Sequence, residues 1–195
     1  SDGMVPRGAK VQCKRGEAIM ESIILLRRQL KEAHEWLEAT MRKVPPAQLH
    51  RKPPGKTESV AMAYAHLVLG EDSAINSMVR RTAPLALTSW AGKTGLCNVS
   101  GRSTVLWADS KAEVEPDLPR FRVFAQAVYA NSDACLASMG DTDLERKADT
   151  LMGQRTVRWV FTGAVIAAIH DFTREVRFLQ DARDARATAM SGLGF

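Results

Sequence analysis

The chain has 195 residues, of which 45% are hydrophobic and 25% charged, which is typical of one globular domain with a real core. No apolar run approaches the roughly 20 residues of a membrane-spanning helix, and no signal-peptide pattern is present, so we expect a cytoplasmic protein without a membrane partner. The formal net charge is +5, but the basic residues are dispersed and aromatic residues make up only 6%, which argues against nucleic acid as a partner.

The chain begins with a predicted flexible tail over residues 1–16, in which glycines and a proline break any helical pattern. Part of this tail, VPRG, resembles the core of a thrombin site that an expression vector can leave. From about Glu17 to Lys43, apolar residues recur at gaps of three and four, which predicts a long amphipathic helix. His34 lies next to this apolar stripe, where a packing or rim role is favoured over metal ligation.

A second helix is predicted to begin near Ser59, because two prolines and a glycine precede it and a hydroxyl group can cap it. Glu71 lies on its apolar stripe, so we expect this carboxylate to have a partner or to reach the surface. His66 lies on the flank of the stripe with Met62 and Gly70 one turn away on either side. These neighbours leave room for a ligand or for a closely packed helix, and a histidine hydrogen-bonded inside a bundle is the alternative interpretation.

Residues 80–117 form a long connection with one short helix predicted near residues 103–110. Its tryptophans, Trp90 and Trp107, can cover a cleft or pack on the outside of a bundle. The sequence GKTG at residues 92–95 lacks the spacing of a phosphate-binding loop, and no strand precedes it. The three cysteines also lack the spacing of a disulfide framework or a zinc knuckle, which predicts free thiols.

A third helix is predicted to begin at Asp117 and to end at Gly140. Residues 141–149 are expected to form a short capped helical turn, and residues 151–155 a loop. A fourth helix is predicted from about Thr156 to Arg183, followed by a loosely held tail over residues 184–195. Because four long amphipathic helices occur without a strand signal, we expect an all-α helical bundle over residues 17–183.

Two histidines from different helices can meet in such a bundle. His170 lies one step round from the apolar face of the fourth helix, between Ile166 and Arg174. It therefore marks the boundary between buried and wet surface, and His66 on the second helix is its candidate partner. The sequence shows no Ser-His-Asp order, no paired carboxylate motif and no H-E-x-x-H.

The chain resembles the DinB/YfiT-like superfamily over roughly residues 20–179. The resemblance is carried by the order and spacing of PPGKTESVAMAYAHLVLGEDSAIN, WAGKTG, LPRFRVFAQAVYANSDACLASMGDTDLER and TVRWVF. It implies an up-down-down-up four-helix bundle, often dimeric, with a divalent metal held by three histidines. One histidine matches His66, and two form an H-x-x-x-H on the fourth helix. Characterised relatives include thiol S-transferases and a mycothiol-dependent maleylpyruvate isomerase, and many others are classed as metal-dependent hydrolases.

The sequence departs from this pattern on the fourth helix. If His170 is the first histidine of the pair, the second position holds Arg174, which cannot ligate a cation. If the helix is aligned on the G-E-I-x-x-L ending of the family, the two positions become Ala168 and Phe172. Both alignments lack a complete three-histidine site, although a two-histidine site completed by Glu71 or Asp171 stays open.

These observations predict a DinB-like bundle with a degenerate metal site that binds a small molecule in its cleft. The candidate cleft residues are Met62, Gly70, Trp90, Trp107, Ile166 and Arg174. The alternative is a metal-dependent thiol S-transferase or hydrolase with a divalent ion, zinc, nickel or manganese, at His66 and His170. A further alternative is a homodimeric scaffold without a ligand.

Overall fold

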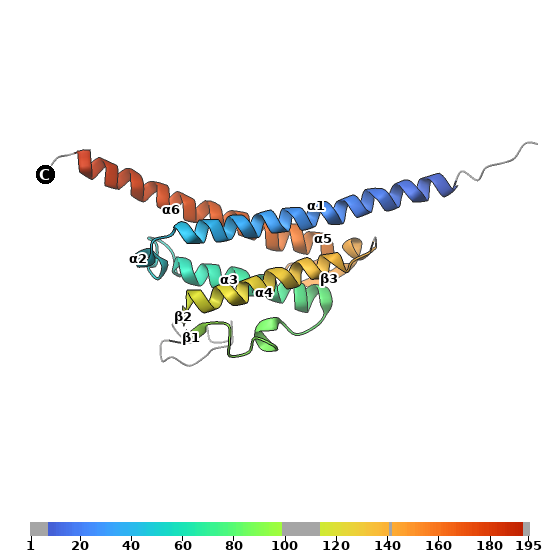
Figure 1. Ribbon diagram of the computed structural model, residues 1–195, viewed down its shortest axis with the longest axis horizontal. Helices are drawn as coiled ribbons and strands as arrows, with labels where there is room; N and C mark the ends of the chain where they lie inside the picture. Colours follow the sequence, from blue (N-terminus) through green and yellow to red (C-terminus); the bar gives the residue numbers. More distant parts are fainter. Residues whose placement is uncertain (1–7, 99–113, 141, 193–195) are drawn as a thin grey trace, which may run out of the picture.

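The computed structural model describes residues 8–98, 114–140 and 142–192, and it is a four-helix bundle (Figure 1). The first helix is α1 (Gly8–Lys43), and the second is α3 (Val60–Ser73) continued by the π-helix η1 (Ala74–Arg80). The third is α4 (Leu118–Ala137). The fourth consists of α5 (Val157–Trp159), the π-helix η5 (Val160–Ile166) and α6 (Ala167–Gly192). The predicted all-α, up-down-down-up bundle is confirmed.

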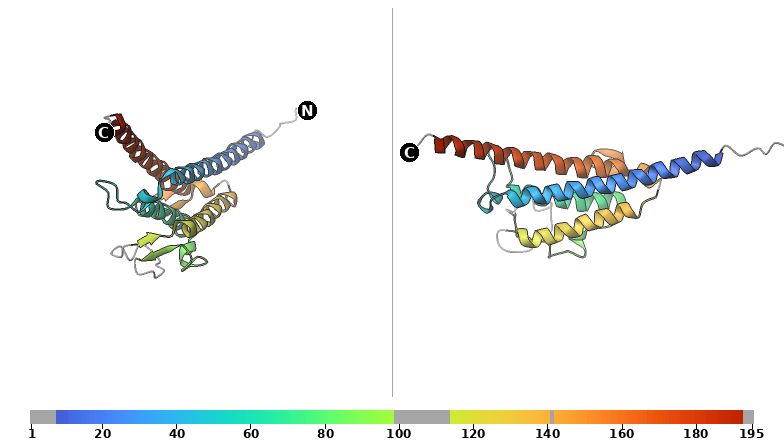
Figure 2. Two further views of the ribbon diagram at one scale, coloured as in Figure 1. Left: turned by 60° about the vertical axis from the view of Figure 1, so that its left-hand side comes forward. Right: turned by 45° about the horizontal axis from the view of Figure 1, so that its top comes forward.

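The helices form a ring in which α1 packs against α4 and α6, and α3 packs against the same two neighbours. Helices α1 and α3 therefore face each other across the centre of the bundle. The first turns of α1 and the last turns of α6 extend beyond the shorter helices at opposite ends (Figures 1 and 2). Large side chains fill the centre, among them the fully buried Tyr64, Phe121, Phe124, Phe161, Leu30 and Leu37.

The predicted helix starts agree with the observed caps. The Ser59 hydroxyl accepts a hydrogen bond from the Met62 N–H at 3.2 Å, and the Asp117 carboxylate accepts one from the Arg120 N–H at 3.3 Å. Thr156 caps the fourth helix in the same way, through the Trp159 N–H at 3.2 Å. These side chains satisfy backbone donors that have no partner within the helix.

The outer ends of the first and fourth helices differ from the prediction. Helix α1 begins at Gly8 instead of near residue 17, and α6 continues to Gly192 instead of ending near residue 183. Residues 184–190, DARATAM, have no proline or glycine and are rich in alanine, which has the highest helix propensity, so the helix continues beyond the end of its apolar stripe. The division into a domain at residues 17–183 and two tails stays a prediction.

The expectation of no strands is wrong at two short antiparallel pairs. Strand β1 (Leu96–Asn98) pairs with β2 (Val114–Pro116), and β3 (Lys147–Thr150) pairs with β4 (Gly153–Thr156). Residues 147–149 were expected in a helical turn and residues 151–155 in a loop, whereas the helical turn is limited to the 3₁₀-helix η4 (Asp143–Glu145). Strands of three or four residues are too short to give an alternating pattern, and Gly153, at φ +82°, provides the turn.

The connection after η1 is fixed to the bundle by a buried carboxylate. Asp72 accepts hydrogen bonds from the backbone N–H groups of Leu85 and Ala86, both at 2.9 Å, where the 3₁₀-helix η2 (Leu85–Leu87) begins. Trp90 packs against Phe124 with ring centroids 5.7 Å apart, as the packing interpretation predicted. Trp107 and the short helix predicted near residues 103–110 lie outside the described residues.

The GKTG sequence forms a structural turn at the start of α4. Gly95 has φ +82°, and a Cβ atom there would lie 2.7 Å from the Phe121 backbone nitrogen. The Gly95 carbonyl accepts a hydrogen bond from the Asp117 N–H at 2.8 Å, so a glycine is required by this close approach.

The remaining short helix, α2 (Pro46–Leu49), follows α1. In the described part of the chain, no helix combines the length and apolar character that crossing a membrane requires.

Candidate functional site

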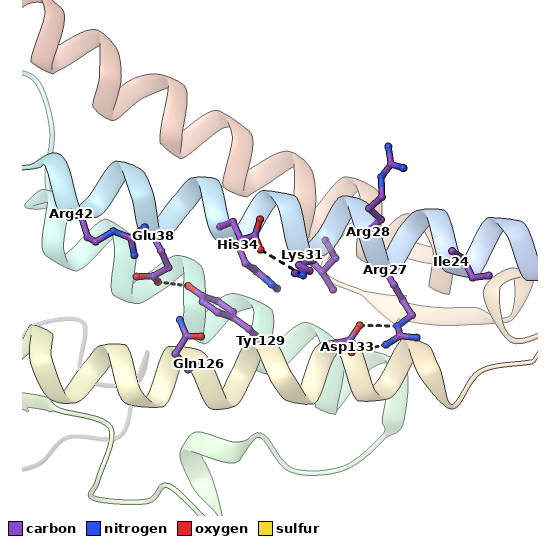
Figure 3. A pocket seen from close by; sticks show the side chains of 12 residues that line it. Ile24, Arg27, Arg28, Lys31, His34, Glu38, Arg42, Gln126, Tyr129 and Asp133 are labelled. Atoms are coloured by element: carbon purple, nitrogen blue, oxygen red, sulfur yellow. Dashed lines mark hydrogen bonds and ion pairs between the residues drawn. The ribbon is translucent and has the colours of Figure 1, made fainter.

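A groove of about 820 Å³ runs between α1 and α4, and we call it the α1–α4 groove (Figure 3). Its walls and rim are mostly charged, and its floor consists of polar side chains that are buried between the helices. The groove is lined by Ile24, Arg27, Arg28, Leu30, Lys31, His34, Glu35, Glu38, Arg42, Gln126, Tyr129 and Asp133.

A hydrogen-bonded group at the floor of the groove joins three helices. The Nε2 atom of His34 on α1 lies 2.9 and 3.1 Å from the two carboxylate oxygens of Glu71 on α3. The hydroxyl of Ser132 on α4 donates to the same carboxylate at 2.6 Å. All three side chains are buried, so Glu71 has the partner that its place on an apolar stripe requires, and that expectation is confirmed.

The Nδ1 atom of His34 is available to a ligand in the groove. Its Nε2 atom is engaged by Glu71, and its ring stacks on Tyr129 with centroids 3.9 Å apart and an angle of 17° between the planes. The residue is only 7% exposed, yet its Nδ1 atom makes no hydrogen bond with any described residue. When Nε2–H donates to the carboxylate, Nδ1 of the neutral ring carries a lone pair, so it can accept a hydrogen bond.

A second hydrogen-bonded group lies beside the first and contains both tyrosines of the chain. Glu38 accepts hydrogen bonds from the Tyr64 hydroxyl at 2.6 Å and from the Tyr129 hydroxyl at 2.9 Å. Burial raises the pKa of Tyr64 well above its ordinary value, and the nearby charge of Glu38 adds to the shift. The pKa of Tyr129 is also raised by burial, with smaller effects of Tyr64 and Glu38. Both phenols therefore stay hydrogen-bond donors at neutral pH.

The two ends of the groove differ in ion pairing, so we call the end that an ion pair bridges the closed end and the other the open end. At the closed end Arg27 forms a bidentate ion pair with Asp133, at 2.7 and 2.8 Å, which joins α1 to α4 (Figure 3). The hydrogen bond from Arg27 is the main reason that the pKa of Asp133 is lowered. At the other end Arg42 is exposed and has no ion-pair partner among the described residues. Its guanidinium can therefore accept an anionic group without breaking an existing pair.

The two histidines singled out from the sequence occupy different surroundings. The Nδ1 atom of His66 lies 2.8 Å from a carboxylate oxygen of Glu58, and its side chain is 31% exposed. His170 is exposed and meets the ring of Trp36 edge-on, with centroids 5.2 Å apart. The assignment of these two residues to a metal site stays a prediction.

Among the described residues, the other predicted site residues are not part of the α1–α4 groove lining, and Glu71 lies beneath the groove. Asp171 and Arg174 form an exposed ion pair with each other at 2.6 Å. Ile166 packs against the core, and Met62 and Gly70 are half-buried on α3. A ligand cleft at these positions stays a prediction, and the α1–α4 groove is a separate site that the sequence interpretation missed.

The donor set does not fit the three-histidine metal site that the resemblance implies. The described residues contain no group of three or more His, Cys, Asp or Glu side chains that could hold a metal ion. The family positions on the fourth helix hold either His170 and Arg174, of which Arg174 is paired with Asp171, or the half-buried Ala168 and Phe172. Neither alternative supplies two nitrogen or oxygen ligands.

The fold and the helix order define this protein as an up-down-down-up four-helix bundle with a buried polar cluster between α1, α3 and α4. Residues 29–172 match the DinB superfamily. Because this match covers most of the chain, the protein belongs to the DinB superfamily. Searches of curated proteins and of solved structures found no match. The metal-dependent activity and the homodimer suggested by the sequence stay predictions.

Sequence reasoning missed the residues that form the floor of the groove, although two signals pointed to them. Glu71 on an apolar stripe demanded a polar partner, and His34 lay beside the apolar stripe of the first helix. The spacing of Lys31, His34 and Glu38 places them on one helix face, next to that stripe. A search for the partner of Glu71 among residues beside other stripes would have included His34 among its candidates.

Proposed function

We propose that the protein binds a small polar molecule in the α1–α4 groove, with His34 as the central contact. The observation that carries this proposal is a buried imidazole whose Nε2 is held by Glu71 and whose Nδ1 makes no hydrogen bond in the described part of the chain. The ring is buried as a whole, but Nδ1 is not among the fully buried atoms that lack a partner, so a ligand in the groove can reach it. A ligand that donates a hydrogen bond to Nδ1 would complete the network.

The ordering of the floor supports binding at this place. His34 is fixed by Glu71 and by stacking on Tyr129, and Tyr129 is in turn fixed by Glu38. Side chains that are held before a ligand arrives lose little conformational entropy on binding. The volume of about 820 Å³ lies within the range of small-molecule sites.

The charges along the groove indicate the chemistry of the ligand. Arg42 at the open end favours an anionic group, because it has no ion-pair partner among the described residues. His34 on the floor favours a hydrogen-bond donor such as a hydroxyl, amide or amine. The expected ligand is therefore a small molecule with an anionic group at one end and a hydrogen-bond donor near its middle.

The proposal is tested by NMR with the full chain labelled at its histidine rings. The probes are three sets of small fragments, which are hydroxycarboxylates, amino acids and uncharged amides. We expect hydroxycarboxylates and amino acids to shift the His34 ring signals and to leave those of His66 and His170 unchanged.

Filling the groove provides the matched comparison. Gln126→Trp places a large side chain on the groove wall and removes no member of the buried network. Val123→Trp places the same side chain on the same helix, but outside the groove, at a position that is 60% exposed. We expect the first variant to lose the fragment-induced shifts and the second to keep them. Fragments that shift only signals outside the groove, or that shift His34 equally in both variants, would contradict the proposal.

A further inference from the structure

A second pocket, separate from the α1–α4 groove, is lined by residues from the end of η1, from the end of α4 and from η4 and its C-cap. Its volume is about 530 Å³, and three arginines contribute to its lining. We call it the arginine pocket, and it is lined by Val79, Arg80, Arg81, Cys135, Ser138, Met139, Asp143 and Arg146.

The three arginines have no ion-pair partner in the described part of the chain. Arg80 donates to the side-chain oxygen of Asn131 at 2.7 Å, and Arg146 donates to the backbone carbonyl of Val79 at 2.8 Å. Both acceptors are uncharged. The carboxylate of Asp143 accepts a hydrogen bond from the Gly140 N–H at 2.7 Å and pairs with none of the arginines. The pocket therefore has an excess of positive charge.

Two of the guanidinium groups are held in place by the fold. Arg80 is the end of a polar chain, in which Asn131 donates to Asn76 at 3.2 Å and Asn76 donates to the fully buried Asp72 at 2.7 Å. Arg146 is held by the end of the π-helix η1 through the carbonyl of Val79. Each of these guanidinium groups uses one donor for its position and keeps others for a ligand.

The backbone brings Arg80 and its neighbour to the same pocket. Consecutive residues of a helix point in different directions, so two adjacent arginines within η1 would not face one ligand. The π-helix η1 ends at Arg80, and the next residue, Arg81, has φ +58°. This change of direction allows both residues to line the pocket. A left-handed backbone at a residue other than glycine is uncommon.

We propose that the arginine pocket binds an oxyanion, a phosphoryl or sulfate group. Three guanidinium groups present planar pairs of N–H donors, which match the oxygens of a tetrahedral anion better than a single carboxylate. The proposal does not depend on the function of the α1–α4 groove, because the two pockets share no lining residue.

The experiment is isothermal titration of the full chain with inorganic phosphate, sulfate and phenyl phosphate, each at the same ionic strength set by chloride. We expect saturable binding of one anion per chain. Arg81→Gln and Arg80→Gln should each weaken binding about tenfold, which corresponds to about 1.4 kcal/mol. Because both side chains are exposed, thermal melting should show that these variants fold normally.

Arg51→Gln is the matched control, since it removes one positive charge from an exposed position outside both pockets. We expect this variant to bind the anions as the unchanged protein does. Tighter binding of phenyl phosphate than of inorganic phosphate would identify a phosphate ester as the ligand, and equal binding would identify the free ion. The proposal is overturned if no anion binds at millimolar concentration, or if Arg51→Gln weakens binding as much as Arg81→Gln.

Discussion

The histidines of this bundle lie in two contrasting regions. His34 is enclosed at the centre, where Glu71, Ser132 and Tyr129 surround it. His66 and His170 lie at or near the surface, and their contacts there are a carboxylate and a tryptophan edge. The family resemblance predicted a site in the second region, whereas burial and the shared hydrogen bonds to Glu71 distinguish the first.

The contrast has an energetic basis. A carboxylate at the centre of a bundle has no water to solvate it, so removal of a partner leaves an unpaired polar group there. A half-exposed carboxylate such as Glu58 regains water when its partner is removed, and the pair contributes little. Paired substitutions in the two regions measure this difference directly.

The largest effect is expected for Glu71→Ala. The substitution leaves the His34 ring and the Ser132 hydroxyl without their buried acceptor, and we expect a loss of about 3 kcal/mol in the free energy of unfolding. Urea denaturation measures this change. Glu58→Ala is the matched control near His66, and there we expect a loss of less than about 1 kcal/mol. Equal losses in the two variants would show that burial does not separate the regions.

The next effect is a loss of stability in alkali. The pKa values of Tyr64 and Tyr129 are raised in the folded protein, so the stability they contribute is complete below the unfolded value of about 10 and is lost as the pH rises. At one pH unit above that value, each tyrosine that stays protonated in the folded protein lowers the free energy of unfolding by about 1.4 kcal/mol. The two together lower it by roughly 2–3 kcal/mol near pH 11.

Tyrosinate absorbance tests this prediction, because the chain contains only these two tyrosines. We expect the signal to appear together with the loss of helical circular dichroism, and to appear near pH 10 when the chain is unfolded in urea. A tyrosinate signal near pH 10 in a chain that keeps its helical circular dichroism would contradict the raised pKa values.

A smaller effect is expected at the rim of the groove. Arg27 lowers the pKa of Asp133, so this pair contributes stability above the unfolded value of about 3.9 and loses it as the pH falls through the folded value. Because the Asp133 side chain is about half exposed, at 48%, screening reduces the contribution to a few tenths of a kcal/mol.

The comparison is between the unchanged protein and Asp133→Asn, by denaturation at pH 7 and near pH 3. The variant should be slightly less stable at pH 7 and equal near pH 3, and added salt should reduce the difference at pH 7. A variant that is more stable than the unchanged protein at pH 7 would show that the pair makes no favourable contribution.

The helical bundle could be predicted from the sequence because helix periodicity and capping depend on residues that are close together in the chain. Ser59, Asp117 and Thr156 each carry a start signal that the structure repeats. The β3–β4 hairpin was missed because it depends on a turn at Gly153 and on strands of only four residues. Local patterns of this length do not distinguish a short strand from a loop.

The site was harder to predict, because its residues come from three helices. Residues 34, 71 and 132 are far apart in the chain, and only the packing of α1, α3 and α4 around one centre brings their side chains together. The sequence did show that Glu71 needed a partner. It could not show which of the four histidines supplied it, since the relative rotation of the helices is not encoded in the spacing of any one helix.

The smallest effect is expected for His66→Ala, and it decides between the two histidine regions. Because His66 is partly exposed, we expect the free energy of unfolding to change by less than about 1 kcal/mol. Fragment-induced shifts of His34 should be unchanged. Elemental analysis of protein purified without a metal-affinity step, beside this variant, should give equal zinc, nickel and manganese contents. A near-stoichiometric ion that is lost in the variant would instead support the metal site predicted at His66 and His170, and thiol-transferase and hydrolase assays would then be justified.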